Sequence, residues 1–155
     1  MTMSSKTRVE MGLMAGVLAT VVMTIAIIVA TSISSALGYP WQIQWYTWIG
    51  SIFGAQGMSG SVAEVGVAWF IALSIVAGLI FAFAFREHSV FEGLAVGLVA
   101  WFLVLVYLAF YTAPQLTGTL QTMSFTVTVE LLIPLAVFFG LWGLAMGLVG
   151  KRYVG

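Results

Sequence analysis

The segment from Val65 to Phe85, VGVAWFIALSIVAGLIFAFAF, contains 21 consecutive residues without a charged side chain. A helix of about 20 apolar residues crosses the hydrocarbon core of a bilayer, so this segment predicts a transmembrane helix. The rest of the chain has the same character. Of its 155 residues, 62% are hydrophobic and 6% are charged, whereas roughly a quarter of the residues in a soluble domain are charged. The sequence is therefore typical of an integral membrane protein.

Four segments are long and apolar enough to cross a membrane, at residues 9–37, 62–85, 93–113 and 127–150. They predict an all-α, four-helix transmembrane bundle that forms one domain over residues 1–155. Lys6 and Arg8 before the first apolar run also fit a cleaved signal peptide. That run is longer than the about 7–15 apolar residues of a signal peptide, so we expect it to remain as a helix.

The basic residues predict the orientation of these helices. They are Lys6, Arg8, Arg86, Lys151 and Arg152. In a four-helix topology all five fall on one side, at the two termini and in the second loop. The first and third loops, at about residues 38–61 and 114–126, contain no lysine or arginine. Since basic loops remain in the cytoplasm, we expect a multi-pass protein of the cell membrane with both termini inside.

Most acidic residues lie at or beside the predicted helix starts. These residues are Glu10, Glu64, Glu92 and Glu130. A carboxylate at a helix start meets unpaired backbone N–H groups and the positive end of the helix dipole, which stabilises the helix by about 0.3–1 kcal/mol. His88, the only histidine, is expected in the cytoplasmic turn after the second helix.

The chain resembles a helical hairpin used twice in parallel orientation. The first and third helices open alike, with Gly12 matching Gly93 and Gly16 matching Gly97. In the second and fourth helices, Gly78 and Gly143 each lie eight residues before a basic residue. Parallel repeats of this kind occur in transporters and wherever a hairpin was duplicated. Chance similarity between helices rich in glycine, leucine and alanine is the alternative.

Small residues at helical spacing predict where the helices pack. Because lipid supplies no hydrophobic drive between helices, close backbone approach at small residues provides the attraction. The positions expected at helix contacts are Gly12, Gly16, Gly93, Gly97, Gly140, Gly143 and Gly147. The glycine stripe of the fourth helix fits packing within the chain and also fits a contact with another subunit.

The first outer loop contains an aromatic segment, and the spacing over residues 40–53 predicts an amphipathic interfacial helix. Its apolar side includes Trp41, Trp45, Trp48 and Ile52. An anchor at headgroup depth is one interpretation, since tryptophan gathers there. A contact face for a partner subunit and a lid over an outward cavity are the others, because aromatic patches without charge are typical of interface cores.

Glu64 and Glu130 are the best candidates for chemistry. Both lie near the predicted outer boundary of equivalent helices, and a carboxylate near the membrane is a candidate for cation or proton binding. The alternative is that each carboxylate only starts its helix. The indole N–H groups of Trp101 and Trp142 need hydrogen-bond partners, for which a backbone carbonyl or a threonine is expected. Thr20 and Thr24 are expected to bond carbonyls of their own helix.

The composition predicts no catalytic residue, no metal site and no cofactor. The chain has no cysteine and one histidine, so it lacks the ligand sets of zinc–thiolate, iron–sulfur, haem and copper sites. Its formal net charge of zero implies no nucleic-acid partner. The expected partners are the lipid bilayer and either other membrane subunits or further copies of the chain.

The first helix carries the pattern Gly12-x2-Ala15-Gly16-x2-Ala19-Thr20-x2-Met23-Thr24. It resembles the opening helix of uncharacterised prokaryotic four-helix membrane proteins, many of them archaeal. The resemblance covers mainly this helix and the hairpin layout. It implies the four-helix fold, but no activity and no site residue.

Three functions are compatible with these patterns, and an enzyme that works alone is the least favoured of them. The first is a non-catalytic accessory or structural subunit of a larger membrane complex of the respiratory or oxidoreductase type. The second is a small ion or solute channel or carrier built from the two hairpins. The absence of a catalytic constellation favours the first.

Overall fold

The computed structural model describes residues 4–38, 49–50, 62–107 and 119–154. Its helices are α1 (Ser5–Ala36), α3 (Val62–Ala84), α4 (Val90–Tyr107) and α5 (Thr119–Val154). All four are long and apolar enough to cross a membrane. The prediction of an all-α, four-helix bundle is confirmed, and the chain is a small multi-pass integral membrane protein.

Helix α1 begins earlier than its apolar pattern suggested. Ser4 caps the helix, and its Oγ accepts a hydrogen bond of 3.2 Å from the backbone N–H of Thr7. A serine at this position satisfies one of the unpaired N–H groups of the first turn. The first turn contains no acidic residue, so the expectation that Glu10 starts this helix was wrong.

Helices α3 and α4 begin with the carboxylates that the sequence indicated. Glu64 lies in the first turn of α3, and Glu92 lies in the first turn of α4. The backbone N–H of Ser89 donates to Glu92 Oε2 over 2.9 Å, while the N–H of Glu92 donates to Ser89 Oγ over 3.2 Å. This reciprocal pair is a capping box, and it fixes the start of α4 directly after the turn from α3.

Helix α5 is longer at its N-terminal end than the predicted span of residues 127–150. It begins at Thr119, next to Gly118 in the sequence, and continues through Pro134. Between Thr119 and Glu130 there is no glycine or proline to stop a helix. Glu130 therefore lies within α5, and the expectation that it starts the helix was wrong. Lys151 and Arg152 lie in the last turn, where the helix dipole favours cations.

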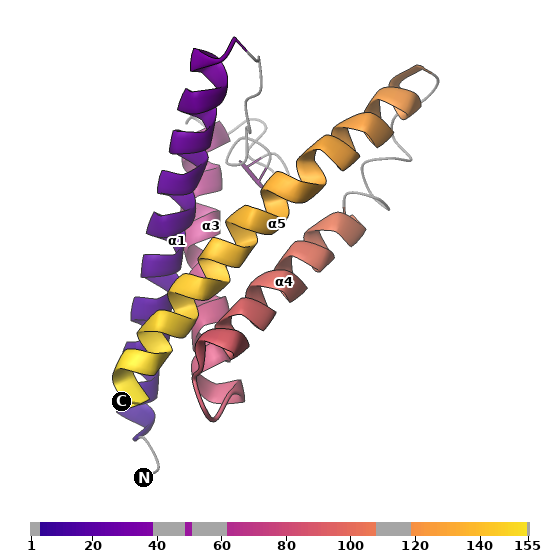
Figure 1. Cartoon of the computed structure of the whole chain (residues 1–155). Coiled ribbons are helices and arrows are strands. Elements are labelled where there is room, and N and C mark those ends of the chain that lie inside the picture. Colours follow the sequence, from indigo (N-terminus) through magenta and orange to yellow (C-terminus); the bar gives the residue numbers. More distant parts are fainter. Residues whose placement is uncertain (1–3, 39–48, 51–61, 108–118, 155) are drawn as a thin grey trace.

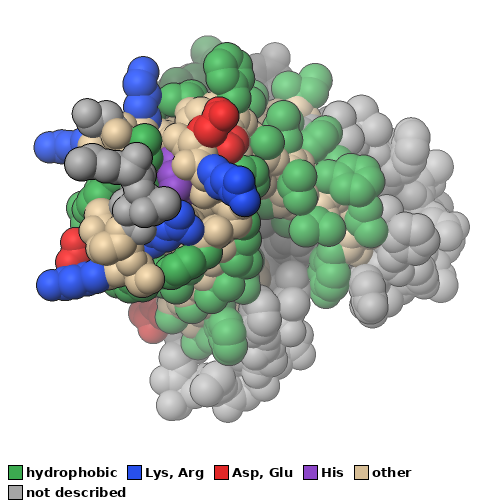
Figure 2. All heavy atoms as spheres, turned by 90° about the horizontal axis from the view of Figure 1, so that it is seen from below, with side chains coloured by type: hydrophobic (Ala, Val, Ile, Leu, Met, Phe, Trp, Pro, Cys, Tyr) green, Lys and Arg blue, Asp and Glu red, His purple; other side chains and the backbone are tan. Residues whose placement is uncertain are grey.

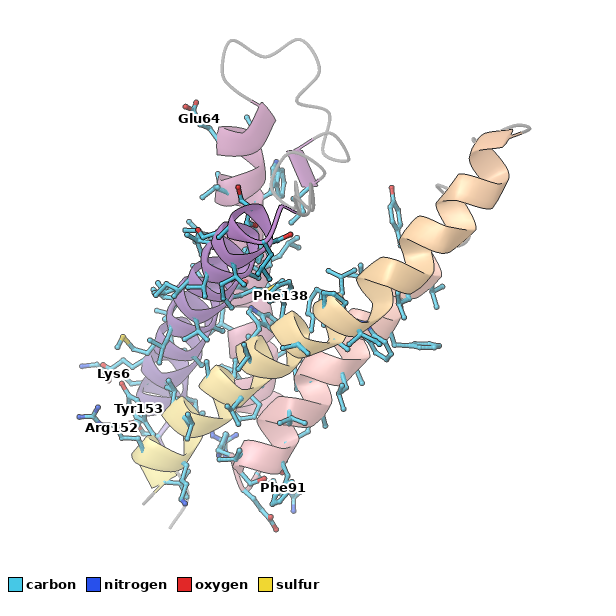
Figure 3. All side chains as sticks on the ribbon, turned by 45° about the horizontal axis from the view of Figure 1, so that its top comes forward. Lys6, Glu64, Phe91, Phe138, Arg152 and Tyr153 are labelled. Carbon is cyan, nitrogen blue, oxygen red and sulfur yellow. The ribbon has the colours of Figure 1, made fainter. Side chains whose placement is uncertain are left out.

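The helices pack as two pairs, α1 with α3 and α4 with α5, and the pairs meet where α1 contacts α5. Helix α3 makes only a small contact with α5. Figure 1 shows α5 crossing α1 near the end that carries both termini, with α4 running beside α5. Towards the opposite end the two pairs diverge, as Figure 3 also shows.

The core lies along the junction of α1, α3 and α5. It includes Met11, Met23, Phe81 and Met146 as buried side chains. Ile49, which lies between α1 and α3 in the sequence, is helical and only 4% exposed, and it belongs to the same cluster. The outer surfaces of the helices carry exposed apolar side chains such as Ile28 and Phe102. In a protein with four membrane spans, this surface contacts lipid.

Candidate functional site

Backbone contact between glycines holds α1 against α3. A Cβ atom added to Gly12 would lie 2.9 Å from the Cα of Leu79, and one added to Gly16 would lie 2.5 Å from the carbonyl oxygen of Ser74. A Cβ added to Gly78 would meet the carbonyl oxygen of Gly12. The two backbones touch at these positions, so no larger residue fits there without moving a helix.

The same contact recurs between α4 and α5. A Cβ on Gly93 would lie 2.5 Å from the backbone N of Gly147, and one on Gly143 would lie 2.9 Å from the Cα of Gly97. A Cβ on Gly147 would lie 2.7 Å from the Cα of Val90. Gly12 and Gly16 thus approach Gly78 as Gly93 and Gly97 approach Gly143, which is the pairing that a duplicated hairpin predicts.

Gly140 does not take part in this contact, because a Cβ added to it would meet nothing within 4 Å. The stripe on α5 therefore packs within the chain at Gly143 and Gly147. It continues to Gly150, where an added Cβ atom would lie 2.9 Å from the carbonyl oxygen of His88.

A buried hydrogen bond joins the two helix pairs near the middle of the molecule. The indole Nε1–H of Trp142 on α5 donates to the hydroxyl Oγ of Ser74 on α3 over 3.1 Å. Trp142 is 4% exposed and Ser74 is fully buried. The expected partner of Trp142 was a backbone carbonyl or a threonine. The actual partner is 68 residues away in the sequence, so local spacing carried no signal for it.

Two threonine hydroxyls of α1 bind carbonyls of their own helix. Thr20 Oγ1 donates to the carbonyl of Gly16 over 3.0 Å, and Thr24 Oγ1 donates to the carbonyl of Thr20 over 2.7 Å. This confirms the expected role of both threonines. Such bonds satisfy a hydroxyl inside the membrane without a partner on a neighbouring helix.

His88 lies in the turn between α3 and α4, as expected, but it is also buried, with 1% of its surface exposed. Its Nε2 lies 3.0 Å from the carbonyl oxygen of Ala82. Since a carbonyl only accepts, Nε2 carries the proton and donates. The other ring nitrogen, Nδ1, is buried and has no hydrogen-bond partner in the described residues. The ring stands edge-on to Phe81, with centroids 5.7 Å apart.

The backbone of His88 is also unusual, with φ at 50°. This left-handed conformation costs a non-glycine residue roughly 1 kcal/mol or more. It turns the chain sharply from the end of α3 into the capping box of α4. Burial of a histidine at this turn could not be read from the sequence, because the contacts come from Phe81 and from Gly150 on α5.

The basic residues gather at the end of the molecule that carries both termini and the α3–α4 turn. Figure 2, which looks onto this end, shows blue side chains around the purple histidine. Lys6 and Arg152 lie on neighbouring helices at this end in Figure 3. This placement agrees with the prediction that the basic residues lie on one side of the membrane. The assignment of that side to the cytoplasm stays a prediction.

The carboxylates that the sequence singled out lie at the other end or within α5. Glu64 is exposed in the first turn of α3, far from the termini (Figure 3). Glu130 is placed by the backbone of α5, and its side chain is outside the described residues. Among the described residues no group of three histidine, cysteine, aspartate or glutamate side chains could hold a metal ion.

The predicted interfacial helix at residues 40–53 falls mostly outside the described residues. This applies to Trp41, Trp45, Trp48 and Ile52. Ile49 and Gly50 within it are helical and buried. Its role as an anchor, a partner surface or a lid therefore stays a prediction.

Comparison of the chain with protein families, with curated proteins and with solved structures finds no match. The resemblance of the first helix to prokaryotic four-helix membrane proteins consequently stays a prediction.

Proposed function

We propose that this protein is a non-catalytic integral membrane subunit of a larger membrane complex, of the respiratory or oxidoreductase type, whose cofactors reside on other chains. In this role both termini face the cytoplasm and the aromatic first loop faces outward. The chain would hold or shield neighbouring subunits by its apolar helix surfaces.

The observation that carries the proposal is the one-sided packing of α4. This helix packs mainly on α5, and Gly93 and Gly97 are its buried residues. On its far side Leu98 is 43% exposed, Phe102 is 60% exposed, and Phe91 at its start is 86% exposed. A transmembrane helix held along a single line presents a broad aromatic and aliphatic surface to lipid or to another membrane subunit.

The polar groups of the interior also support a structural role. The hydroxyl of Ser74 and the indole of Trp142 bind each other, and Thr20 and Thr24 bind their own helix. Buried polar groups that satisfy one another stabilise and orient helices. Each of these groups thus has a packing role in the described core.

The test is purification of the tagged chain from its native membranes in a mild detergent. We expect a defined set of membrane subunits, at fixed stoichiometry and with a redox cofactor, to co-migrate with it on a native gel. The double variant Leu98→Ala/Phe102→Ala removes the exposed α4 side chains and should lower partner recovery at least tenfold. The matched variant Ile25→Ala/Ile28→Ala, on the exposed side of α1, should leave it unchanged.

Recovery of the wild-type chain alone, as a single species in bilayer-like nanodiscs prepared directly from the membrane, would overturn this proposal. Equal recovery of partners with both double variants would remove α4 from the contact.

A second candidate is a small ion or solute carrier. The observation that favours it is the matching glycine contact in each helix pair, together with the divergence of the pairs at the end where Glu64 lies. Parallel repeats that rock against each other are one architecture of transporters. In this candidate Glu64 and Glu130 would bind a cation or proton. Glu64→Gln and Glu130→Gln should then abolish flux in liposomes, whereas Glu87→Gln in the turn should not.

A further inference from the structure

We propose that a second copy of this chain packs against the first, with α4 of one copy on α3 of the other. This contact between chains resembles the contact that α1 makes with α5 within one chain. The inference begins with the two glycine contacts. Because Gly12 and Gly78 correspond to Gly93 and Gly143, residues 9–26 of α1 have counterparts 81 residues later on α4. Each position of α3 has a counterpart 65 residues later on α5.

The corresponding sides of α3 and α5 differ sharply in exposure. On α5, Phe138 and Ala145 are each 4% exposed. Their counterparts on α3 are Leu73, which is 45% exposed, and Ile80, which is 57% exposed. Leu73 and Ile80 are therefore uncovered on α3 at positions that α5 buries in the core, whereas Ala77 between them is partly buried against the core. We call Leu73, Ala77 and Ile80 the α3 face.

The corresponding sides of α1 and α4 also differ in exposure, and the side on α4 is the more exposed of the two. Ala15 on α1 is fully buried, whereas its counterpart Val96 is only partly buried. Leu103 is 61% exposed, at the position that corresponds to the partly buried Val22. We call Val96, Ala100 and Leu103 the α4 face, of which Val96 and Ala100 are partly buried against the core of their own chain and Leu103 is exposed.

These two faces are expected to complement each other, because their counterparts on α5 and α1 belong to helices that pack together within the chain. Each face is aliphatic and has an alanine in its middle, Ala77 or Ala100. A small residue there lets two helices approach closely, which is what drives association in lipid. One chain carries both faces, so two copies related by a two-fold axis make the contact twice.

A contact between the α3 face of one copy and the α4 face of another is favoured over a contact between the two faces of one chain. Helices α3 and α4 are joined by a short turn and diverge from it, and the contacts between them are few. Lipid also covers exposed apolar side chains, but it does not distinguish these faces from other exposed sides of the helices. Cross-linking separates the three occupants.

The experiment uses the absence of native cysteine. Leu73→Cys is placed in a chain with one tag and Leu103→Cys in a chain with another. Leu73 lies 13 residues before Arg86, and Leu103 lies 14 residues after Ser89, so the two are at similar depth. The purified chains are mixed in liposomes at high lipid-to-protein ratio and treated with a thiol-specific cross-linker. We expect a product that carries both tags.

The matched control is Ala72→Cys with Phe102→Cys, two exposed positions at similar depth that are turned by about 100° from Leu73 and Leu103 around α3 and α4. This pair should give at least tenfold less cross-linked product. The double variant Leu73→Cys/Leu103→Cys, diluted with an excess of cysteine-free chain, tests closure within one chain. A cross-link that survives dilution, or equal yields for the two pairs, overturns the proposal, and so does the absence of any product. Because only this chain is present, the result does not depend on the proposed accessory role.

Discussion

The indole N–H of Trp142 and the hydroxyl of Ser74 lie 3.1 Å apart in the buried junction of the two helix pairs, where α5 meets α3. The hydrogen bond between them joins α5 to α3. It fixes the rotation of α5 about its axis relative to α3, because a tryptophan nitrogen donates in one direction only.

Removal of the Ser74 hydroxyl should therefore leave the Trp142 N–H without an acceptor. We expect Ser74→Ala to lower the free energy of unfolding by about 1 kcal/mol, in the range of hydrogen bonds within membranes. In the Ser74→Ala background, Trp142→Phe should cost about 1 kcal/mol less than in the wild type. Unfolding in mixed micelles of increasing denaturing detergent measures all four variants, and additive costs would contradict the bond.

The glycine contacts predict opposite outcomes for two substitutions of the same kind. Gly78→Ala places a Cβ on the backbone of α1, at the carbonyl of Gly12 and 2.7 Å from the N of Gly16. Such overpacking should cost about 1–3 kcal/mol or more. Gly140→Ala meets nothing within 4 Å, and it should be neutral or stabilising by up to about 1 kcal/mol, because alanine favours the helix.

The same unfolding assay compares these two alanine variants with Gly143→Ala. A Cβ on Gly143 would meet the backbone of α4, so Gly143→Ala should resemble Gly78→Ala. Equal stability of Gly78→Ala and Gly140→Ala would show that the close approach of α1 and α3 is not formed in the bilayer.

The left-handed backbone of His88 predicts which of two variants at this position is more stable. Both His88→Ala and His88→Gly remove the buried ring and its bond to Ala82, so both should be destabilised. Alanine keeps the strain of a φ of 50°, and glycine does not. His88→Gly should therefore be more stable than His88→Ala by about 1 kcal/mol. The reverse order in thermal unfolding would indicate an ordinary turn conformation.

The capping box at the start of α4 allows the contribution of the Ser89 hydroxyl to be tested apart from that of the Glu92 charge. Ser89→Ala should cost about 1 kcal/mol, because the N–H of Glu92 loses its acceptor. Glu92→Gln should cost less, since glutamine also accepts from the N–H of Ser89. Amide hydrogen exchange over residues 89–93 should be faster in Ser89→Ala. Unchanged exchange there would exclude the cap.

The distribution of basic residues predicts the orientation in the membrane. A cysteine placed at Gln44 should react with a membrane-impermeant maleimide from outside intact cells. A cysteine at Glu87, in the α3–α4 turn, should react only after permeabilisation. Labelling in the reverse pattern would place both termini outside.

Sequence patterns predicted the fold because hydropathy and charge report directly on membrane crossing. The apolar span predicted at residues 62–85 agrees with α3, Val62–Ala84, within one residue at each end. The start of α5 was missed because hydropathy detects the lipid-spanning part of a helix, while its polar beginning at Thr119 is still helical. Glu10 was misplaced for the same reason, since Ser4 caps α1 before the apolar run begins.

The candidate site was less predictable, since it depends on contacts between distant segments. Gly12, Gly16 and Gly78 could be selected from their spacing, yet Gly140 has the same spacing and faces no neighbour. Spacing places a residue on one side of a helix, but only the crossing geometry decides which stretch of that side is covered. The burial of His88 likewise depends on α5, which follows much later in the chain.

The 36 residues of α5 correspond to about 54 Å of helix, at about 1.5 Å per residue, against a hydrocarbon core of about 30 Å. Such an excess is relieved by tilt or by protrusion into water. The apolar span of α5 is Ile133–Val154, which is about 33 Å long at about 1.5 Å per residue and matches the hydrocarbon core. The excess therefore lies at the N-terminal end of α5, which extends beyond the hydrocarbon core on the side opposite Lys151 and Arg152.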